Sequence, residues 1–257
     1  MKLEMPVLGK YGKAIPGSAS LNFCESGTQH CETACRHHPE STAKDATRGC
    51  YAVTLEQRHD RKELKNKLRR HYKMGPARVV GKAILELQDR VEKGKKPPWI
   101  RLSTDGSVPP PEKADALFIR QLRTFLTICR DNDIPVHFPV ESYGKRQFYH
   151  SKVGDLVCVR VSLQNTQAQW LYKGPCSWVA GTDILSGPNI RRRRIDSARF
   201  EAKRRYNATG RKSIYCPAIF GGWFLRGPGS KEKRMKMKCG NCVACANPNV
   251  DVVYAYH

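Results

Sequence analysis

Apolar and polar residues alternate along the middle of the chain with two different periods. Residues 76–94 and 110–133 repeat apolar side chains every three to four positions, the spacing of an amphipathic helix. Between and after them lie short, nearly continuous apolar runs, several of which stop at Gly, Pro or Asp. These runs predict strands at 97–107, 134–142, 155–164, 176–181 and 250–257.

More polar segments complete the expected order of elements. Residues 53–73 and an arginine-rich stretch after residue 189 are predicted as basic helices, and shorter helical pieces end at Phe148 and cover 165–172. Strands that alternate with helices and are apolar throughout favour an α/β fold with parallel strands. We expect a partial (β/α) barrel or an open parallel sheet, with cysteine-rich metal-cluster loops near both ends of the chain.

Polar residues follow four successive predicted strands. In parallel α/β folds the carboxyl ends of the strands form the active site, so these residues are candidates for a shared pocket. Turn formation is the alternative explanation for each of them taken singly. The residues are Ser103, Thr104 and Asp105, then Glu141 and Ser142, then Ser162 and Gln164, and finally Thr182 and Asp183.

The chain is expected to form one domain. Its 257 residues suffice for a large core, and no internal repeat or long flexible linker interrupts them. Within the single α/β domain 1–257 we distinguish an N-terminal cluster loop, 20–52, and a basic helix with a C-terminal cluster segment, 189–257. No run of eighteen apolar residues and no signal sequence is present, which predicts a cytoplasmic protein of a bacterial host cell without membrane contact.

Positive charge is the strongest feature of the composition. The net charge is +23, and three stretches carry 17 of it: residues 56–73, 189–212 and 231–238. Solvated helix faces explain one such run, but three runs favour a polyanion, for which nucleic acid is preferred over a membrane surface or a small phosphorylated substrate. The candidate phosphate-binding residues are Arg191, Arg192, Arg193, Arg194, Lys203, Arg204, Arg205, Lys67, Arg69 and Arg70.

A cysteine run near the C-terminus predicts a metal centre. Three cysteines stand at intervals of three positions in "KCGNCVACANPN", and a remote Cys-Pro pair precedes them. Such a run with a distant fourth cysteine is typical of iron–sulfur ligation, so we expect a [4Fe–4S] cluster. Zinc remains the alternative. The ligands would be Cys216, Cys239, Cys242 and Cys245.

A second group of cysteines lies in the N-terminal third. Four of them fall within 27 residues rich in Gly, Ser, Thr and Asp, which favours a ligand-bearing loop over a packed core. Neighbouring histidines are alternative ligands if the metal is zinc. The cysteines are Cys24, Cys31, Cys35 and Cys50, and the histidines are His30, His37 and His38.

These motifs together resemble a known group of proteins. The loop ending in "GCYA", the strand breaking as "RLSTDGS", the late Cys-Pro, the "CGNCVAC" run and the final strand ending in His257 resemble the phage "gene product 88" family of cysteine-rich proteins encoded by mobile elements. The layout is similar to a radical S-adenosylmethionine (SAM) partial barrel with an auxiliary C-terminal cluster. The resemblance covers about a quarter of the chain.

The resemblance implies roles for individual residues. Cys31, Cys35 and Cys50 would hold the SAM cluster, with Tyr51 as the neighbouring aromatic residue. The segment Ser103, Thr104, Asp105 and Gly106 would lie where such enzymes hold the amino group of SAM. This chain departs from the pattern in two respects, because the last cysteine gap is fourteen residues long and the usual Gly-Gly-Glu is replaced by Thr-Asp-Gly.

Cys24 decides between two of the three resulting hypotheses. If it is a fourth ligand, the N-terminal cluster is closed, and the chain is an iron–sulfur protein that binds nucleic acid without turnover. If it is not, three thiolates leave one iron open, and a radical-SAM-like enzyme acting on DNA or RNA is expected. A zinc-binding module without iron is the third hypothesis. The sequence contains no P-loop, Gly-x-Ser-x-Gly or His-Glu-x-x-His motif of a hydrolase.

Overall fold

Helices and parallel strands make up the part of the chain that the structure describes. The computed structural model describes residues 6–10, 18–24, 62–103, 107–163, 171–180, 186–216 and 244–255. These residues form two compact units, which divide between Val159 and Arg160. The α/β class with mostly parallel strands is confirmed. Closure into a partial barrel and organisation as one domain stay predictions.

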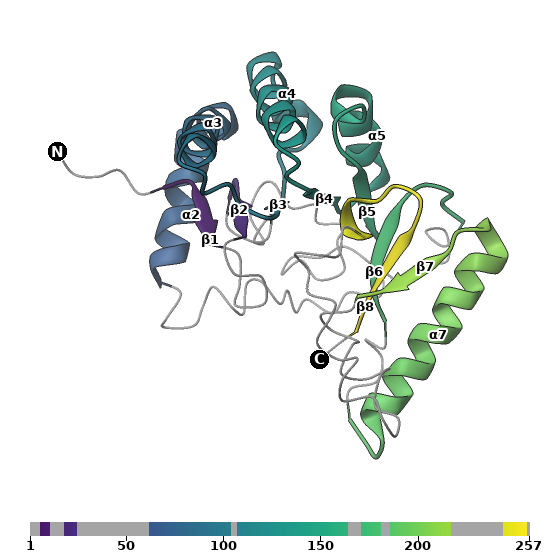
Figure 1. Ribbon diagram of the computed structural model, residues 1–257. Helices are drawn as coiled ribbons and strands as arrows, with labels where there is room; N and C mark the ends of the chain where they lie inside the picture. The colour runs from purple at the N-terminus through teal and green to yellow at the C-terminus, as the bar shows by residue number, and fades with distance from the viewer. Residues whose placement is uncertain are drawn as a thin grey trace. The chain divides into compact units, whose positions relative to one another are not determined.

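The described part of the first unit is built on four short strands. They are β1 (Leu8–Lys10), β2 (Ala19–Leu21), β3 (Ile100–Leu102) and β4 (Val136–Val140), and they lie in this order. The pair β1–β2 is antiparallel, whereas β2–β3 and β3–β4 are parallel (Figure 1). Because parallel strands end on the same side, the residues that follow β2, β3 and β4 lie along one edge of this sheet.

Four of the described helices belong to the first unit. They are α2 (Lys62–Met74), α3 (Pro76–Glu92), α4 (Ala116–Asp131) and α5 (Tyr143–Val153), and the 3₁₀ turn η2 (Pro111–Lys113) precedes α4. Helices α3, α4 and α5 lie side by side along the strands (Figure 1). Proline at the first position suits the start of α3, and the carboxylate of Asp115 accepts a hydrogen bond from the Phe118 N–H (2.7 Å) at the start of α4.

The core of this unit is aromatic, and its edge is tied by a carboxylate. The ring of Phe118 meets Phe23 edge to face at 5.7 Å between centroids. Glu86 of α3 accepts hydrogen bonds from the backbone N–H groups of Val7 and Leu8, at 2.6 and 2.9 Å. These bonds fix the outer strand β1 to the helical layer.

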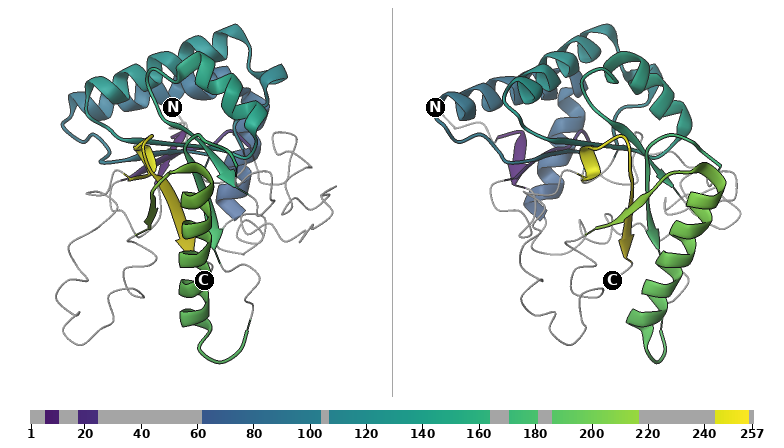
Figure 2. Two further views of the ribbon diagram at one scale, coloured as in Figure 1. Left: turned by 90° about the vertical axis from the view of Figure 1, so that its right-hand side faces the viewer. Right: turned by 45° about the vertical axis from the view of Figure 1, so that its right-hand side comes forward.

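The second unit also contains four strands, and all of them are parallel. They are β5 (Val159–Leu163), β6 (Cys176–Ala180), β7 (Ser213–Tyr215) and β8 (Asp251–Ala255), in the order β5-β6-β8-β7. The long helix α7 (Ile190–Thr209) packs on β6 and β8, and the turn η5 (Ala244–Ala246) leads into β8 (Figure 2). Gly210 ends α7 in the left-handed conformation, φ 71°.

The structure differs from the expected elements at several places. The predicted helix 110–133 is divided, because the proline-rich start forms η2 and Asp115 begins a new helix at Ala116. Strands β1, β2 and β7 were not predicted. The described part of helix 53–73 is α2, while residues 53–61 and most of 165–172 lie outside the described residues.

Candidate metal-ligand sites and basic surfaces

Two predicted ligands of the C-terminal metal centre lie near the same end of the second unit. Cys216 directly follows β7, and its N–H donates to the carbonyl of Val253 at 2.8 Å, which places Cys216 beside Tyr254 in the ladder. The hydroxyl of Tyr254 lies 3.2 Å from the Sγ of Cys245. Cys216 is buried and Cys245 is half-buried. Cys239 and Cys242 lie outside the described residues.

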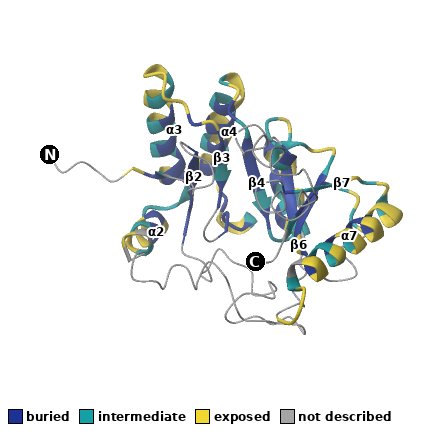
Figure 3. Cartoon of the chain, turned by 60° about the horizontal axis from the view of Figure 1, so that its bottom comes forward, coloured by how far each residue is buried: buried dark blue, intermediate teal, exposed yellow. Residues whose placement is uncertain are grey.

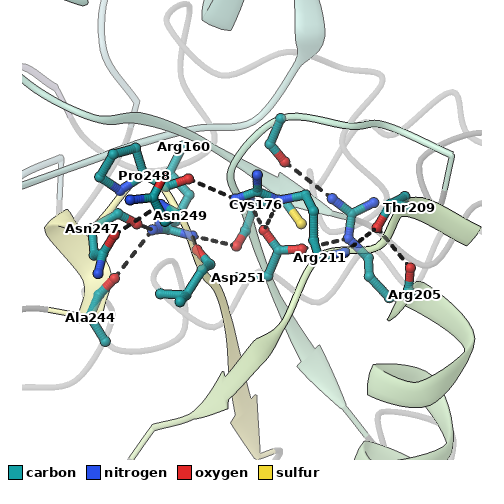
Figure 4. Close-up of polar contacts among 12 residues, drawn as sticks. Arg160, Cys176, Arg205, Thr209, Arg211, Ala244, Asn247, Pro248, Asn249 and Asp251 are labelled. Atoms are coloured by element: carbon teal, nitrogen blue, oxygen red, sulfur yellow. Dashed lines mark hydrogen bonds and ion pairs between the residues drawn. The ribbon is translucent and has the colours of Figure 1, made fainter. Parts of the chain in front are cut away.

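The segment after the cysteine run is held by one buried arginine. Arg160 of β5 is wholly enclosed, and its guanidinium donates five hydrogen bonds of 2.6–3.2 Å to backbone carbonyls (Figure 4). A guanidinium has five N–H donors, so every donor is used. The acceptors are the carbonyls of Cys176, Ala244, Cys245, Asn247 and Val250. This Arg160 clamp fixes the backbone on both sides of Cys245.

A buried carboxylate joins α7 to β8. The side chain of Asp251 is fully buried; its Oδ2 accepts from Arg205 Nε (2.8 Å), and its Oδ1 accepts from Arg211 Nε (2.9 Å) and the Cys176 N–H (3.1 Å) (Figure 4). Arg205 is equally buried and also donates to the carbonyl of Gly174. Although Arg205 is among the predicted phosphate-binding residues, its guanidinium belongs to this internal ion pair.

Two cysteines outside the predicted ligand sets behave as core residues. Burial raises the pKa of the Cys129 thiol to about 12, and burial together with the Asp251 carboxylate raises the pKa of Cys176. Both thiols therefore stay protonated at neutral pH.

Helix α7 separates its basic residues between two faces. The buried face carries Ala198 and Ala202 together with Arg194 and Arg205. The opposite side is exposed along the length of the helix (Figure 3). Its exposed basic residues are Arg192, Arg193, Arg199, Lys203 and Arg204. The side chain of Arg191 lies outside the described residues.

The exposed face of α7 also presents two aromatic side chains. Phe200 is 68% exposed and Tyr206 is 51% exposed. Phe200 was not among the residues predicted from the sequence. It stands two positions before Ala202, which places it on the far side of the helix from the buried alanines.

A second basic surface lies on α2 in the first unit. Arg69 and Arg70 are exposed, as predicted for phosphate-binding residues, whereas Lys67 is only half exposed. Burial lowers the pKa of Lys67, and the Glu86 carboxylate partly opposes this effect. On the inner side of α2, His71 donates from Nδ1 to the carbonyl of Asn22 at 2.7 Å, and burial lowers the pKa of its imidazole.

Of the four predicted cofactor-binding residues, the structure describes Ser103, which lies at the carboxyl edge of the first sheet. Ser103 follows β3 with a left-handed backbone, φ 53°, and its N–H donates to the carbonyl of Leu21 at 2.8 Å. Its hydroxyl is buried without a hydrogen-bond partner among the described residues. Thr104, Asp105 and Gly106 lie outside the described residues.

A buried lysine organises the next part of this edge. The ammonium of Lys145 contacts the carboxylate of Glu141, the Ser107 hydroxyl (3.0 Å) and the Val108 carbonyl (3.2 Å). The Ser107 hydroxyl in turn donates to the Glu141 carboxylate. The sequence predicts Glu141 as a pocket residue but not Lys145, although the two stand four positions apart at the start of α5. Ser142, the other predicted residue here, caps α5.

Cys24 lies at the same edge, after β2. It is fully buried, and its Sγ is 3.7 Å from the carbonyl oxygen of Ser107, so the thiol donates to that oxygen. Its predicted partners Cys31, Cys35 and Cys50 lie outside the described residues.

Two kinds of feature are not found among the described residues. Among the described residues, no three His, Cys, Asp or Glu side chains gather in a geometry that would hold a metal ion. Within the same ranges, every helix is too short or too polar to serve as a membrane span.

Comparison with known proteins adds no relative to these observations. The chain matches no protein-family model, no curated protein and no solved structure.

Proposed function

We propose that this chain is an iron–sulfur protein of a phage or plasmid that binds nucleic acid through its basic surfaces. The observation that carries the proposal is the exposed face of α7, where five basic side chains share one side of a helix with a single exposed acid, Asp196. The carboxylate of Asp196 lies 4.0 Å from the Nε of Arg192 and 3.7 Å from the Nη1 of Arg199. The face keeps a net positive charge, as a phosphate backbone requires.

The metal centre is supported by the way the C-terminal segment is held. Cys216 and Cys245 are placed near Tyr254, and the Arg160 clamp keeps the backbone at Cys245 in position. Soft thiolate ligands suit iron–sulfur clusters or zinc. A cluster bound there would supply one-electron chemistry or a structural crosslink, while zinc would supply the crosslink alone.

Salt-dependent binding tests the nucleic-acid part. We expect a labelled oligonucleotide to bind the purified protein, with a log–log salt slope that falls in magnitude by about three when Arg192, Arg193, Lys203 and Arg204 are changed to Gln. The matched control changes four exposed basic residues of the first unit, Arg78, Lys93, Lys95 and Lys113, to Gln. If both variants lose affinity and slope equally, α7 is not the binding face.

Metal analysis tests the cluster part. Protein purified without oxygen should be brown and contain about eight irons and equivalent sulfide, four for each [4Fe–4S] cluster. Changing Cys245 to Ser should remove about half of the iron, whereas Cys129→Ser in the core should remove none. A colourless protein that holds two zincs per chain would support the zinc alternative and exclude iron.

The contact of Cys24 favours a second candidate function. If Cys24 stays a thiol in its contact with the Ser107 carbonyl when a cluster is bound, the N-terminal cluster has three cysteine ligands, Cys31, Cys35 and Cys50. Three thiolates match the radical-SAM-like alternative, in which the open iron binds SAM. We expect Cys24→Ser to keep all of its iron, and the EPR signal of the reduced variant to shift when SAM is added. Loss of iron in this variant would instead identify Cys24 as a ligand.

A further inference from the structure

An aromatic ring stands in the middle of the basic face of α7. Phe200 is 68% exposed, although a phenyl ring is ordinarily buried. On a helix, residues three, four and seven positions apart share a face. Lys203 and Arg204 follow Phe200 by three and four positions, and Arg193 precedes it by seven, so basic residues flank the ring on both sides along the helix.

Phe200 does not lie on the packed side of α7. The helix packs on β6 and β8 through its other side, where Ala198 and Ala202 are buried. A second exposed aromatic residue, Tyr206, lies near the end of the same helix. Exposed aromatic rings between cations are the arrangement in which proteins stack nucleotide bases while they neutralise phosphates.

We propose that the exposed face of α7 is a single-strand-binding surface, on which Phe200 stacks against an unpaired base and Arg193, Lys203 and Arg204 contact the flanking phosphates. The inference rests on the proposed function and makes it specific. A single strand is favoured because its bases can turn toward the ring, whereas paired bases present only their edges in the grooves. A duplex would use the cations and leave the ring without a partner.

The length of the face sets the size of the site. From Arg192 to Arg204 the helix rises about 18 Å at 1.5 Å per residue. A stacked strand advances about 3.4 Å per nucleotide, so the face covers about five nucleotides. An oligonucleotide of about 12 residues is therefore long enough for a binding measurement.

The experiment compares strand type and the ring in one titration series. Fluorescence anisotropy is measured with a 12-nucleotide single-stranded DNA, the RNA of the same sequence, and the corresponding duplex DNA. The proteins are the unchanged chain, Phe200→Ala, Phe200→Trp and a control, Leu85→Ala, which removes a side chain of similar exposure (67%) from α3. Circular dichroism of each variant checks that the fold is kept.

The expected result is a preference for single strands that depends on the ring. Phe200→Ala should weaken single-strand binding by about 5-fold to 100-fold and leave duplex binding unchanged, because stacking is lost and the charges remain. Phe200→Trp should restore the affinity, and Leu85→Ala should not change it. Equal affinity of Phe200→Ala and the unchanged chain for single strands, or a preference for duplex, would overturn the inference and leave the proposed function standing. No binding of any oligonucleotide at low salt would overturn both.

Discussion

The two units bury their cations in different ways. In the second unit Asp251 and Arg205 are both wholly enclosed, and Arg211 binds the other oxygen of the same carboxylate. In the first unit Lys145 is enclosed, but the side chain of its partner Glu141 keeps 16% of its surface exposed. A sealed ion pair can only hold elements together, whereas a carboxylate that reaches solvent is also able to meet a ligand.

This difference separates architecture from site. The sealed pair joins the C-terminal part of α7 to the first residue of β8, and its loss is expected to act on stability alone. The open pair lies at the carboxyl edge of the first sheet with Cys24 and Ser103, where α/β proteins bind their ligands. Variants of the two acids therefore distinguish the two regions.

The largest effect is expected from the sealed pair. Asp251→Asn leaves Arg205 buried without its counter-charge, so the free energy of unfolding should fall by about 3–5 kcal/mol in urea denaturation. The control is Asp155→Asn, which breaks the exposed pair with Arg123 and should change stability little. Similar losses in the two variants would mean that enclosure does not govern the strength of these pairs.

A smaller effect is expected from the open pair. Glu141→Gln keeps an oxygen that accepts from Lys145 and Ser107, and solvent reaches the site, so the loss should be about 1–3 kcal/mol. The same urea titration measures it, with Asp115→Asn at the start of α4 as a control that also replaces a hydrogen-bonded carboxylate. A loss as large as that of Asp251→Asn would show that Glu141 is sealed like its counterpart.

The smallest expected effect is a pH dependence of stability at His71, because burial of this imidazole disfavours its protonated form. The folded pKa of His71 lies below its ordinary 6.5, so below that pH the unfolded chain takes up a proton that the folded chain refuses. The free energy of unfolding should fall as the pH drops below 6.5, by at most about 1.4 kcal/mol per pH unit. His71→Gln should flatten this slope between pH 5 and 7, and the exposed His150→Gln should not.

Local signals were sufficient to predict much of the first unit. The apolar period and Pro76 predicted α3 to within two residues of its end, because helix faces and caps are encoded by neighbours in sequence. Strand β7 was missed because three residues cannot display a period. The alternation of strands and helices predicted that the residues after β3 and β4 lie at one edge of a parallel sheet. It did not predict Lys145, because the burial of this lysine depends on its contact with Ser107, 38 positions earlier.

The division of the arginines on α7 shows why the candidate site was predicted only in part. The helix is polar on almost every side, so periodicity gives no inward face. Arg205 is buried because it pairs with Asp251, which lies 46 positions further along the chain. The sequence around Arg205 does not predict this pairing. Arg204 is its sequence neighbour and yet faces solvent. Only the three-dimensional position of the acid separates an arginine that is buried in an ion pair from one that faces solvent.

The Arg160 clamp has a consequence for how the C-terminal segment tolerates mutation. Its five bonds end on backbone carbonyls, so the clamp recognises the course of the chain and not the identity of its side chains. As far as the clamp is concerned, Ala244 and Val250 are then replaceable wherever their backbone angles are kept, whereas the Oδ1 of Asn247 also accepts a hydrogen bond from the Asn249 N–H. Arg160 has no such substitute, because no other side chain offers five donors in one plane. Selection for the course of this segment would therefore act on Arg160. This residue lies 84–90 positions earlier in the sequence than the carbonyls of the segment that it binds.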